Sequence, residues 1–334
     1  MGSYIKLNNP ISIFSSASVV GNKERNGPMG SKFDHWDKED KFGADTWERA
    51  ESEMQKIALN LAASKAKISE KELDALMAGD LINQCTSSAY GLLHFDVPFF
   101  GLYGACSTAA ESLMLAALLI DGGHFSRIGT VVSSHNCSAE RQFRFPLEYG
   151  GQRTPTSQWT VTGSAAFLLS HGDMHPYISE VLPGRSFDFG INDANDMGAA
   201  MAPAAADTII RYFREANDTD SIDKIITGDL GLHGYKILCD LIMREGLDIR
   251  DRLTDCGMLI YDLNEKDVHF GGSGCGCSAV MLSAHFLDEL RSGNLGSILF
   301  IGTGALMSPA ALQQGENIPS IAHLVRINAP RGVR

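Results

Sequence analysis

Two short segments, separated by almost half the chain, repeat nearly the same sequence. Residues 73–81 read LDALMAGDL and residues 222–230 read IDKIITGDL, so Gly79 and Gly228 lie 149 positions apart. Each segment is a short apolar run that ends at Gly-Asp, which is typical of a buried strand followed by a turn. The chain has 334 residues, a length that suits two fused halves of about 150 residues each. The repeat predicts an internal duplication with a pseudo-two-fold axis and halves at residues 1–172 and 173–334.

Strand-like and helix-like segments alternate along both halves. In the first half we predict strands at 11–17, 74–81, 97–104, 127–135 and 165–170, with helices at 47–66 and 109–120. In the second half we predict strands at 177–182, 223–230, 257–261, 297–304 and 321–327, with helices at 203–216, 235–245 and 278–290. This alternation favours an α/β protein with parallel sheets covered by helices. Loops at the strand ends of both halves then meet in one crevice, where ligands of such sheets usually bind.

A cysteine lies where an apolar strand-like run turns into a helix. The run 97–104 leads directly to Cys106, and Thr108 with Glu111 matches a capping box at the start of the helix. A helix N-terminus carries partial positive charge and unpaired N–H groups, so it stabilises a thiolate or a bound anion. Three interpretations therefore stay open for Cys106: a nucleophile, the floor of an anion pocket, or a small buried residue at the junction.

Composition excludes several classes of protein. The net charge of −12 argues against a general nucleic-acid binder, which would present a basic surface. Seven scattered cysteines fit a reducing compartment better than a disulfide framework. We find no N-terminal signal pattern, and the longest uncharged apolar helix falls far short of the ~20 residues that span a bilayer. We expect a soluble chain that is not secreted. The lone C-x-C at 275–277 predicts no zinc site.

The order of the elements and the cysteine elbow resemble the thiolase fold, in which two βαβαβαββ halves form a layered αβαβα architecture. Longer segments resemble the stage V sporulation protein AD family of spore-forming Firmicutes, and they run from near the first strand to the last. These segments are 27–28, 78–81, 101–108, 133–136, 139–144, 148–152, 196–198, 202–208, 271–275 and 319–323. The resemblance implies binding of dipicolinic acid, which is pyridine-2,6-dicarboxylate and is stored as its calcium chelate.

The same resemblance implies partners and a location. Family members are implied to help move dipicolinate into the developing spore, together with spore stage V A membrane proteins encoded alongside them. The chain would then associate peripherally with the spore inner membrane. Thiolase-fold proteins are generally dimers paired at a sheet edge, so the resemblance also implies a homodimer. It implies no cofactor, apart from calcium as part of the ligand.

Catalytic members of the superfamily imply a test of enzyme against binding protein. Decarboxylating ketoacyl synthases supply a histidine and an asparagine from two loops of the second half. His233 is the candidate for the histidine, whereas alignment of a Ser-Ala pair puts Gly276 at the asparagine position. Phe300 stands where thiolases carry a second catalytic cysteine. We therefore predict a non-catalytic dipicolinate-binding protein.

Two other functions remain as hypotheses. The first is an acyl-CoA-dependent acyltransferase or condensing enzyme that uses Cys106 and His233. The second is a purely structural scaffold for spore membrane proteins.

A pocket for dipicolinate must bind a flat aromatic ring with two carboxylates. Such a pocket needs arginine or histidine side chains, backbone amides at a helix start and an apolar slot. The candidate ligand-binding residues are Asp80, Cys106, Ser107, Thr108, His135, Arg141, Arg144, Asp229, His233 and His323. Structural roles compete with this prediction. Asp80 and Asp229 are candidates for helix caps, Arg141 and Arg144 for surface or interface charges, and His323 for a core histidine.

Overall fold

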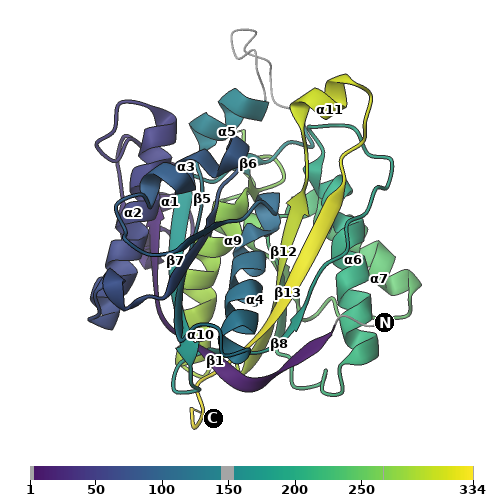
Figure 1. The fold of residues 1–334 in the computed structure, drawn as a ribbon. Helices are drawn as coiled ribbons and strands as arrows, with labels where there is room; N and C mark the ends of the chain where they lie inside the picture. The colour runs from purple at the N-terminus through teal and green to yellow at the C-terminus, as the bar shows by residue number, and fades with distance from the viewer. Residues whose placement is uncertain (1–3, 144–153, 266, 334) are drawn as a thin grey trace.

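The fold is built on a large mixed β-sheet covered by helices (Figure 1). The computed structural model describes residues 4–143, 154–265 and 267–333, and in this part of the chain the sheet has eleven strands. In spatial order, ten of them are β10 (Leu253–Asp255), β9 (Lys224–Thr227), β12 (Ser297–Ala305), β13 (Ser320–Asn328), β8 (Tyr177–Leu182), β1 (Ile5–Val20), β7 (Gly163–His171), β5 (Arg127–Ser134), β3 (Ala75–Gly79) and β4 (Phe99–Gly101). The eleventh, β2 (His35–Trp36), pairs with β1, while β6 (Trp159–Thr160) and β11 (Gly272–Ser273) pair separately.

The strand order repeats between the two halves of the chain. Outward from the central β1–β8 pair, the strands of the first half follow the order β1-β7-β5-β3-β4, and those of the second half follow the order β8-β13-β12-β9-β10. In each half the first strand is followed by the last strand of that half, and the remaining strands extend to the edge of the sheet. The segments that repeat Gly-Asp form β3 and β9, which occupy the same place in the two halves. The predicted boundary at 172/173 lies between β7 and β8 and stays a prediction.

Helices form three layers around the strands. The central layer holds α4 (Thr108–Asp121) and α9 (Cys275–Met281), and α9 continues through a π-helical turn (Leu282–Phe286) into α10 (Leu287–Arg291). Helix α4 contacts β1 and β7 of the first half and β12 and β13 of the second. Figure 1 shows α2 (Trp47–Ala66) and α3 (Thr86–Gly91) on one outer side, with α6 (Met197–Glu215) and α7 (Gly231–Arg244) on the other. The arrangement is the layered thiolase-like αβαβα architecture expected from the sequence.

The hydrophobic pattern explains which helices lie inside. Helix α4 is apolar on nearly all sides and its buried residues include Leu113, Met114 and Ile120, as expected for a helix packed between the two halves of the sheet. Helix α2 instead buries one face, which includes Met54 and Leu59. The remaining helices are short: α1 (Asn22–Arg25), α5 (Asn136–Phe143), α8 (Cys256–Ile260) and α11 (Pro309–Gln313). No helix in the described ranges is long and apolar enough to cross a membrane.

Three local predictions from the sequence are wrong. The segment 257–261 is not a strand, because the Asp255 carboxylate accepts the Met258 N–H and begins helix α8 there. Helix α6 begins at Met197 rather than at 203, because Asp196 caps it through the Ala199 N–H. The capping box at α4 does not form. The Thr108 hydroxyl instead accepts the Gly104 N–H and donates to the Ala105 carbonyl.

Glycines of β12 allow the cysteine elbow to pack directly on this strand. A Cβ atom added to Gly304 would lie 2.4 Å from the Gly104 carbonyl oxygen, and one added to Gly302 would lie 2.7 Å from the Ser107 carbonyl oxygen. Because both obstacles are backbone atoms, neither can move aside without shifting the elbow. The close approach of β12 therefore depends on glycine at both positions.

We predict that Gly304→Ala lowers the free energy of unfolding by about 2 kcal/mol, because the added methyl group forces the elbow away from β12. Chemical denaturation of the purified variant measures this change. The control is Gly101→Ala on β4, where the nearest atom to an added Cβ is a Phe99 ring carbon at 3.5 Å. Equal losses in the two variants would contradict the packing argument.

Candidate functional site

The cysteine elbow is a tight turn between β4 and α4. Ala105 has φ of 49°, a left-handed conformation that L-residues rarely adopt and that is often found at functional sites. The turn is held by the Ser107 hydroxyl, which donates to the Gly104 carbonyl at 2.6 Å. Ala105 and Ser107 are buried, whereas Cys106 between them keeps part of its surface exposed. The turn therefore leaves part of Cys106 accessible to solvent.

The side chain that faces Cys106 is the carboxylate of Asp229, which follows β9 of the second half. Asp229 is completely buried and lies close enough to the Cys106 thiol for its charge to act on it. Its Oδ2 accepts the Gly274 N–H at 2.8 Å, and its Oδ1 accepts the Thr303 hydroxyl at 2.8 Å. Burial raises the pKa of Asp229 to about 7, and these hydrogen bonds counteract burial only in part. One carboxylate thus joins the elbow to three segments of the second half.

This environment opposes ionisation of the Cys106 thiol. Burial, followed by the charge of Asp229, raises the pKa of the Cys106 thiol well above its usual value. Reactive cysteines need the opposite, a thiolate stabilised by a nearby cation or by a helix N-terminus. The site therefore disfavours the thiolate that a nucleophile requires.

The backbone amides at the elbow are already hydrogen-bonded. The Ser107 N–H donates to the Gly104 carbonyl at 3.0 Å, and the Thr108 N–H donates to the Ala105 carbonyl. This corrects the expectation that these two amides are free for an anion. Both donors are used inside the 3₁₀ turn (Ala105–Ser107) that makes the elbow.

The structure places His233 away from the contacts of the Cys106 thiol. His233 lies in the first turn of α7, where its Nδ1 pairs with Asp196 Oδ1 at 3.1 Å and its ring centroid lies 5.6 Å from that of Phe270. The loop after β9 therefore brings Asp229, rather than His233, against Cys106.

Gly276 and Phe300, the other two positions that were compared with catalytic relatives, are both tightly packed. A Cβ on Gly276 would lie 2.4 Å from the Gly163 carbonyl oxygen and 2.6 Å from Ser134 Oγ, so an asparagine there would need backbone movement. Phe300 is completely buried within β12. The residue of β12 that reaches the site is Thr303, which sequence reasoning missed.

The other two predicted histidines, His135 and His323, form hydrogen bonds within the protein. His135 donates from Nε2 to the Asp40 carbonyl at 2.8 Å and accepts the Cys137 N–H at Nδ1. His323 accepts the Gly184 N–H at Nδ1, as the core-histidine alternative expected. Burial lowers the pKa of His135 and lowers that of His323 to about 4, so both rings are neutral near pH 7.

The remaining predicted residues divide into exposed and buried groups. Arg141 is exposed and forms an ion pair with Glu48 of α2, in agreement with the surface-charge alternative. Arg144 lies outside the described residues. Asp80 accepts the N–H groups of Ile82 and Ser88 and the Ser88 hydroxyl, so it organises the turn after β3. In the described ranges, no group of three or more His, Cys, Asp or Glu side chains is arranged to hold a metal ion.

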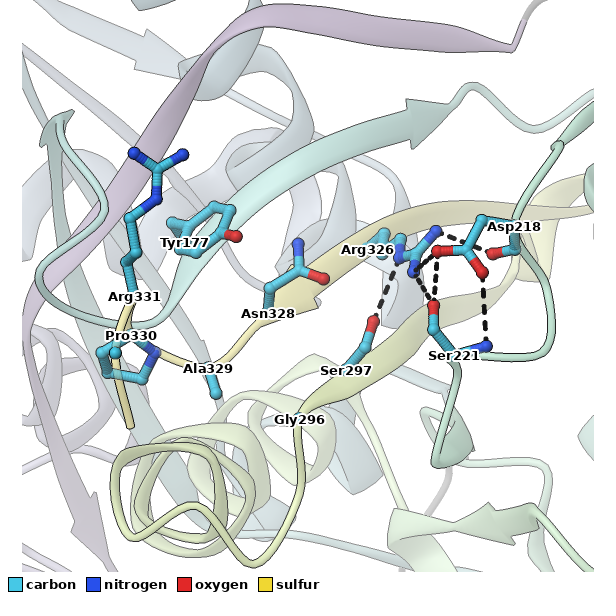
Figure 2. A pocket seen from close by; sticks show the side chains of 11 residues that line it. Tyr177, Asp218, Ser221, Gly296, Ser297, Arg326, Asn328, Ala329, Pro330 and Arg331 are labelled. Atoms are coloured by element: carbon cyan, nitrogen blue, oxygen red, sulfur yellow. Dashed lines mark hydrogen bonds and ion pairs between the residues drawn. The ribbon is translucent and has the colours of Figure 1, made fainter. Parts of the chain in front are cut away.

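A hollow of about 300 Å³ lies at the opposite end of β12 (Figure 2). Ser297, the first residue of β12, and Asn328, the last residue of β13, line it. The buried Arg326 at its wall donates to Ser297 Oγ at 3.0 Å and to Ser221 Oγ at 2.5 Å, and it pairs with Glu180. None of the residues predicted as ligands lines this hollow, and its arginine is already committed to protein partners.

We predict that Asp229→Asn increases the rate of Cys106 alkylation by iodoacetamide at pH 8 by roughly tenfold, because loss of the negative charge lowers the pKa of the thiol. Mass spectrometry of the Cys106 peptide measures the rate, with Cys239 of the same chain as the internal reference. Asp196→Asn, which alters the partner of His233, is the control variant and keeps the wild-type rate. An unchanged or slower rate in Asp229→Asn would contradict the assigned contact.

Two sequence comparisons with known proteins point to the same family. The sequence profile of the family described as "Stage V sporulation protein AD (SpoVAD)" matches residues 2–328. The Bacillus subtilis (strain 168) protein "Stage V sporulation protein AD" is 44% identical over 315 residues, which cover 94% of this chain and 93% of that protein.

Solved structures of similar fold are proteins of distant sequence. 3-Oxoacyl-(acyl carrier protein) synthase III from Xanthomonas oryzae pv. oryzae is 15% identical, with a TM-score of 0.60 over 96% of this chain and 100% of that chain. A crystal structure of OleA from Xanthomonas campestris is also 15% identical, with a TM-score of 0.60 over 96% of this chain and 99% of that chain. These likenesses establish the thiolase-like fold, and the sequence matches establish that the chain belongs to the stage V sporulation protein AD family.

Proposed function

We propose that this protein binds dipicolinic acid, or its calcium chelate, without catalysing a reaction, and that it supports dipicolinate uptake into the developing spore. The observation that carries the non-catalytic part is the contact between Asp229 and the Cys106 thiol. Membership of a sporulation protein family supports the choice of ligand. We place the ligand at the solvent-accessible part of Cys106.

Acyl transfer through a thioester has requirements that this site does not meet. The nucleophile must become a thiolate, with a base or a hydrogen-bond donor placed to assist it. Here the neighbouring group is an acid whose charge opposes ionisation of Cys106. The histidine candidate His233 pairs with Asp196, and packing leaves no room for an asparagine at 276. We therefore propose that this protein has the fold of these enzymes without their acyl-transfer chemistry.

The electrostatics near the elbow favour a ligand with little net charge. Asp229 and Asp80 are both completely buried at the ends of the equivalent strands β9 and β3. Two carboxylates disfavour a nearby dianion, whereas calcium dipicolinate has no net charge. Calcium is thus part of the ligand in this proposal, and the protein itself needs no separate metal site.

Membrane association follows from partners rather than from the chain's own surface. With a net charge of −12, the protein is repelled by anionic lipids. We therefore propose that it is held peripherally at the spore inner membrane by spore stage V A membrane proteins, with no role for nucleic acid.

We predict that Cys106→Ala weakens dipicolinate binding at least roughly tenfold, because the ligand loses the contact that we propose it makes with this side chain. Isothermal titration calorimetry, with calcium and with a calcium chelator, measures the affinity. Cys239→Ala on the outer helix α7 is the matched control and keeps wild-type affinity. Unchanged affinity in Cys106→Ala would remove Cys106 from the site, and absence of binding to the wild-type protein at millimolar dipicolinate under both conditions would refute the proposed ligand.

We also propose a homodimer formed through the edge of the sheet at β4. All three residues of β4 are exposed, and Phe99 and Phe100 keep 42% and 43% of their surface accessible. Tyr90, Leu93 and Tyr103 add exposed apolar surface near this edge in the sequence. Unpaired edge strands with apolar side chains are natural sites of pairing between chains.

We predict that Phe100→Asp converts the dimer to a monomer, because a charge at the paired edge must be desolvated on association. Sedimentation equilibrium measures the mass. Met174→Asp is the control, since Met174 is a highly exposed apolar residue outside β4. A wild-type monomer, or a Phe100→Asp dimer as stable as that of the control, would contradict this interface.

A further inference from the structure

A cluster of buried polar side chains lies between α2 and the first half of the sheet. Glu51 and Gln55, one turn apart on α2, are both completely buried, as is Asp80 at the end of β3. Ser133 of β5 donates to Glu51 Oε1 at 2.9 Å, and Ser138 of α5 donates to Glu51 Oε2 at 2.7 Å. Because both serines are buried as well, the whole cluster is withdrawn from solvent.

The hydrogen bonds fix the orientation of the Gln55 amide. Its Nε2 donates to Ser133 Oγ at 2.7 Å and to Ser88 Oγ at 2.9 Å. Both hydroxyls can accept because each gives its own proton to a carboxylate: Ser133 to Glu51, and Ser88 to Asp80 at 2.6 Å. Reversing the amide would place its oxygen against two hydroxyl oxygens without a proton between them.

In this orientation Gln55 Oε1 is left without a hydrogen-bond donor, although the residue is completely buried. An unpaired buried acceptor is costly, so a missing donor is expected nearby. Glu51, at the i−4 position on the same helix, lies on the same face of α2. The two donors to consider are the Glu51 carboxyl group, if it is protonated, and the hydroxyl of Ser87, which is also buried without a hydrogen-bond partner.

The two buried carboxylates of the cluster, Glu51 and Asp80, also favour binding of a proton. The titratable groups that act on Glu51 from the packed elements are Asp80 at the end of β3 and Cys275 on α9, and neither is cationic. On the exposed side of the helix, Arg141 of α5 is engaged with Glu48. Asp80 accepts two backbone N–H groups, which cannot reverse direction, and the Ser88 hydroxyl, whereas the donors to Glu51 are serine hydroxyls alone. Burial and the charge of Asp80 raise the pKa of Glu51 to about 8.

We propose that Glu51 is a protonated carboxylic acid at neutral pH, that its O–H donates to Gln55 Oε1, and that it thereby acts as a positioning residue for Ser133. The Ser133 carbonyl accepts the Cys275 thiol at 2.9 Å, and the adjoining Gly274 N–H binds Asp229. Glu51 thus supports the floor of the elbow without touching it. This inference goes beyond the proposed function and does not depend on which ligand binds.

The first test is infrared spectroscopy of the full chain, using the carbonyl stretch of a protonated carboxylic acid as the signature. Between wild type and Glu51→Gln at pH 7, we expect a difference band for one lost carboxylic acid. Bands from other buried acids, such as Glu24 and Asp229, cancel in this difference. In the wild-type protein the band should disappear as the pH rises through about 8. No difference band at pH 7 would mean that Glu51 is ionised and would overturn the proposal.

The second test is the pH dependence of stability. Because the pKa of Glu51 is raised from 4.5 to about 8 in the folded protein, its contribution to stability is fully present below about 4.5, falls as the pH rises from there to about 8, and does not change further above that range. Glu51→Gln keeps a donor for Gln55, so the slope of log K for unfolding between about pH 5 and pH 7 should fall by up to about one proton. Glu53→Gln, on the same helix and paired with Lys56 near the surface, should keep the wild-type slope. Equal slopes in all three proteins would overturn the proposal.

A second variant keeps the proposal testable if Glu51→Gln does not fold. Gln55→Met removes the proposed acceptor while keeping the side-chain length, so the Glu51 carbonyl band should shift to higher frequency. An unshifted band would exclude Gln55 as the partner. A wild-type stability that depends on one particular cation, together with no carboxylic acid band from Glu51, would show that a bound cation rather than a proton neutralises the cluster.

Discussion

The candidate site depends on the hydrogen bonds of the buried Asp229 carboxylate. This carboxylate accepts the Gly274 N–H and the Thr303 hydroxyl and contacts the Cys106 thiol, so it connects the start of α9, the end of β12 and the elbow of the first half. Hydrogen bonds to a charged group contribute about 1.5–3 kcal/mol each. The duplicated fold brings these segments together because the ends of β3, β9 and β12 face the same central layer of helices.

The architecture around Asp229 is shared with a solved 3-oxoacyl-(acyl carrier protein) synthase III. The structural likeness extends over almost the whole chain at 15% identity, which speaks to architecture alone. The elbow, the left-handed Ala105 and the close glycine contacts of β12 preserve a geometry suited to presenting a cysteine. The neighbour of that cysteine is an acid, and its charge reverses the effect that a helix start would otherwise have on the thiol.

Much of the fold could be predicted from local sequence. The Gly-Asp repeat marks β3 and β9, and periodicity alone gives the bounds of α2 and β8. These predictions succeed because strand and helix patterns depend on neighbours in the sequence. The segment 257–261 fails because an apolar run of that length fits either state, and the Asp255 cap decides it.

The site was harder to predict because its partners come from distant segments. Asp229 and Thr303 are 74 positions apart, and nothing in either local pattern indicates their bond. Glu51 was missed because an acid in an amphipathic helix usually points to solvent, whereas here serines of two other elements surround it. The free amides expected at Ser107 and Thr108 are consumed by a turn that begins only with the unusual backbone of Ala105.

The central claim is that Cys106 forms part of a binding site and is not a nucleophile. Mass spectrometry of the intact protein after incubation with acyl-CoA donors tests this most directly, because a condensing enzyme must first form a thioester at this cysteine. We predict that the wild-type protein keeps its unmodified mass. An acyl adduct that appears on the wild type and is absent from Cys106→Ser would contradict the account.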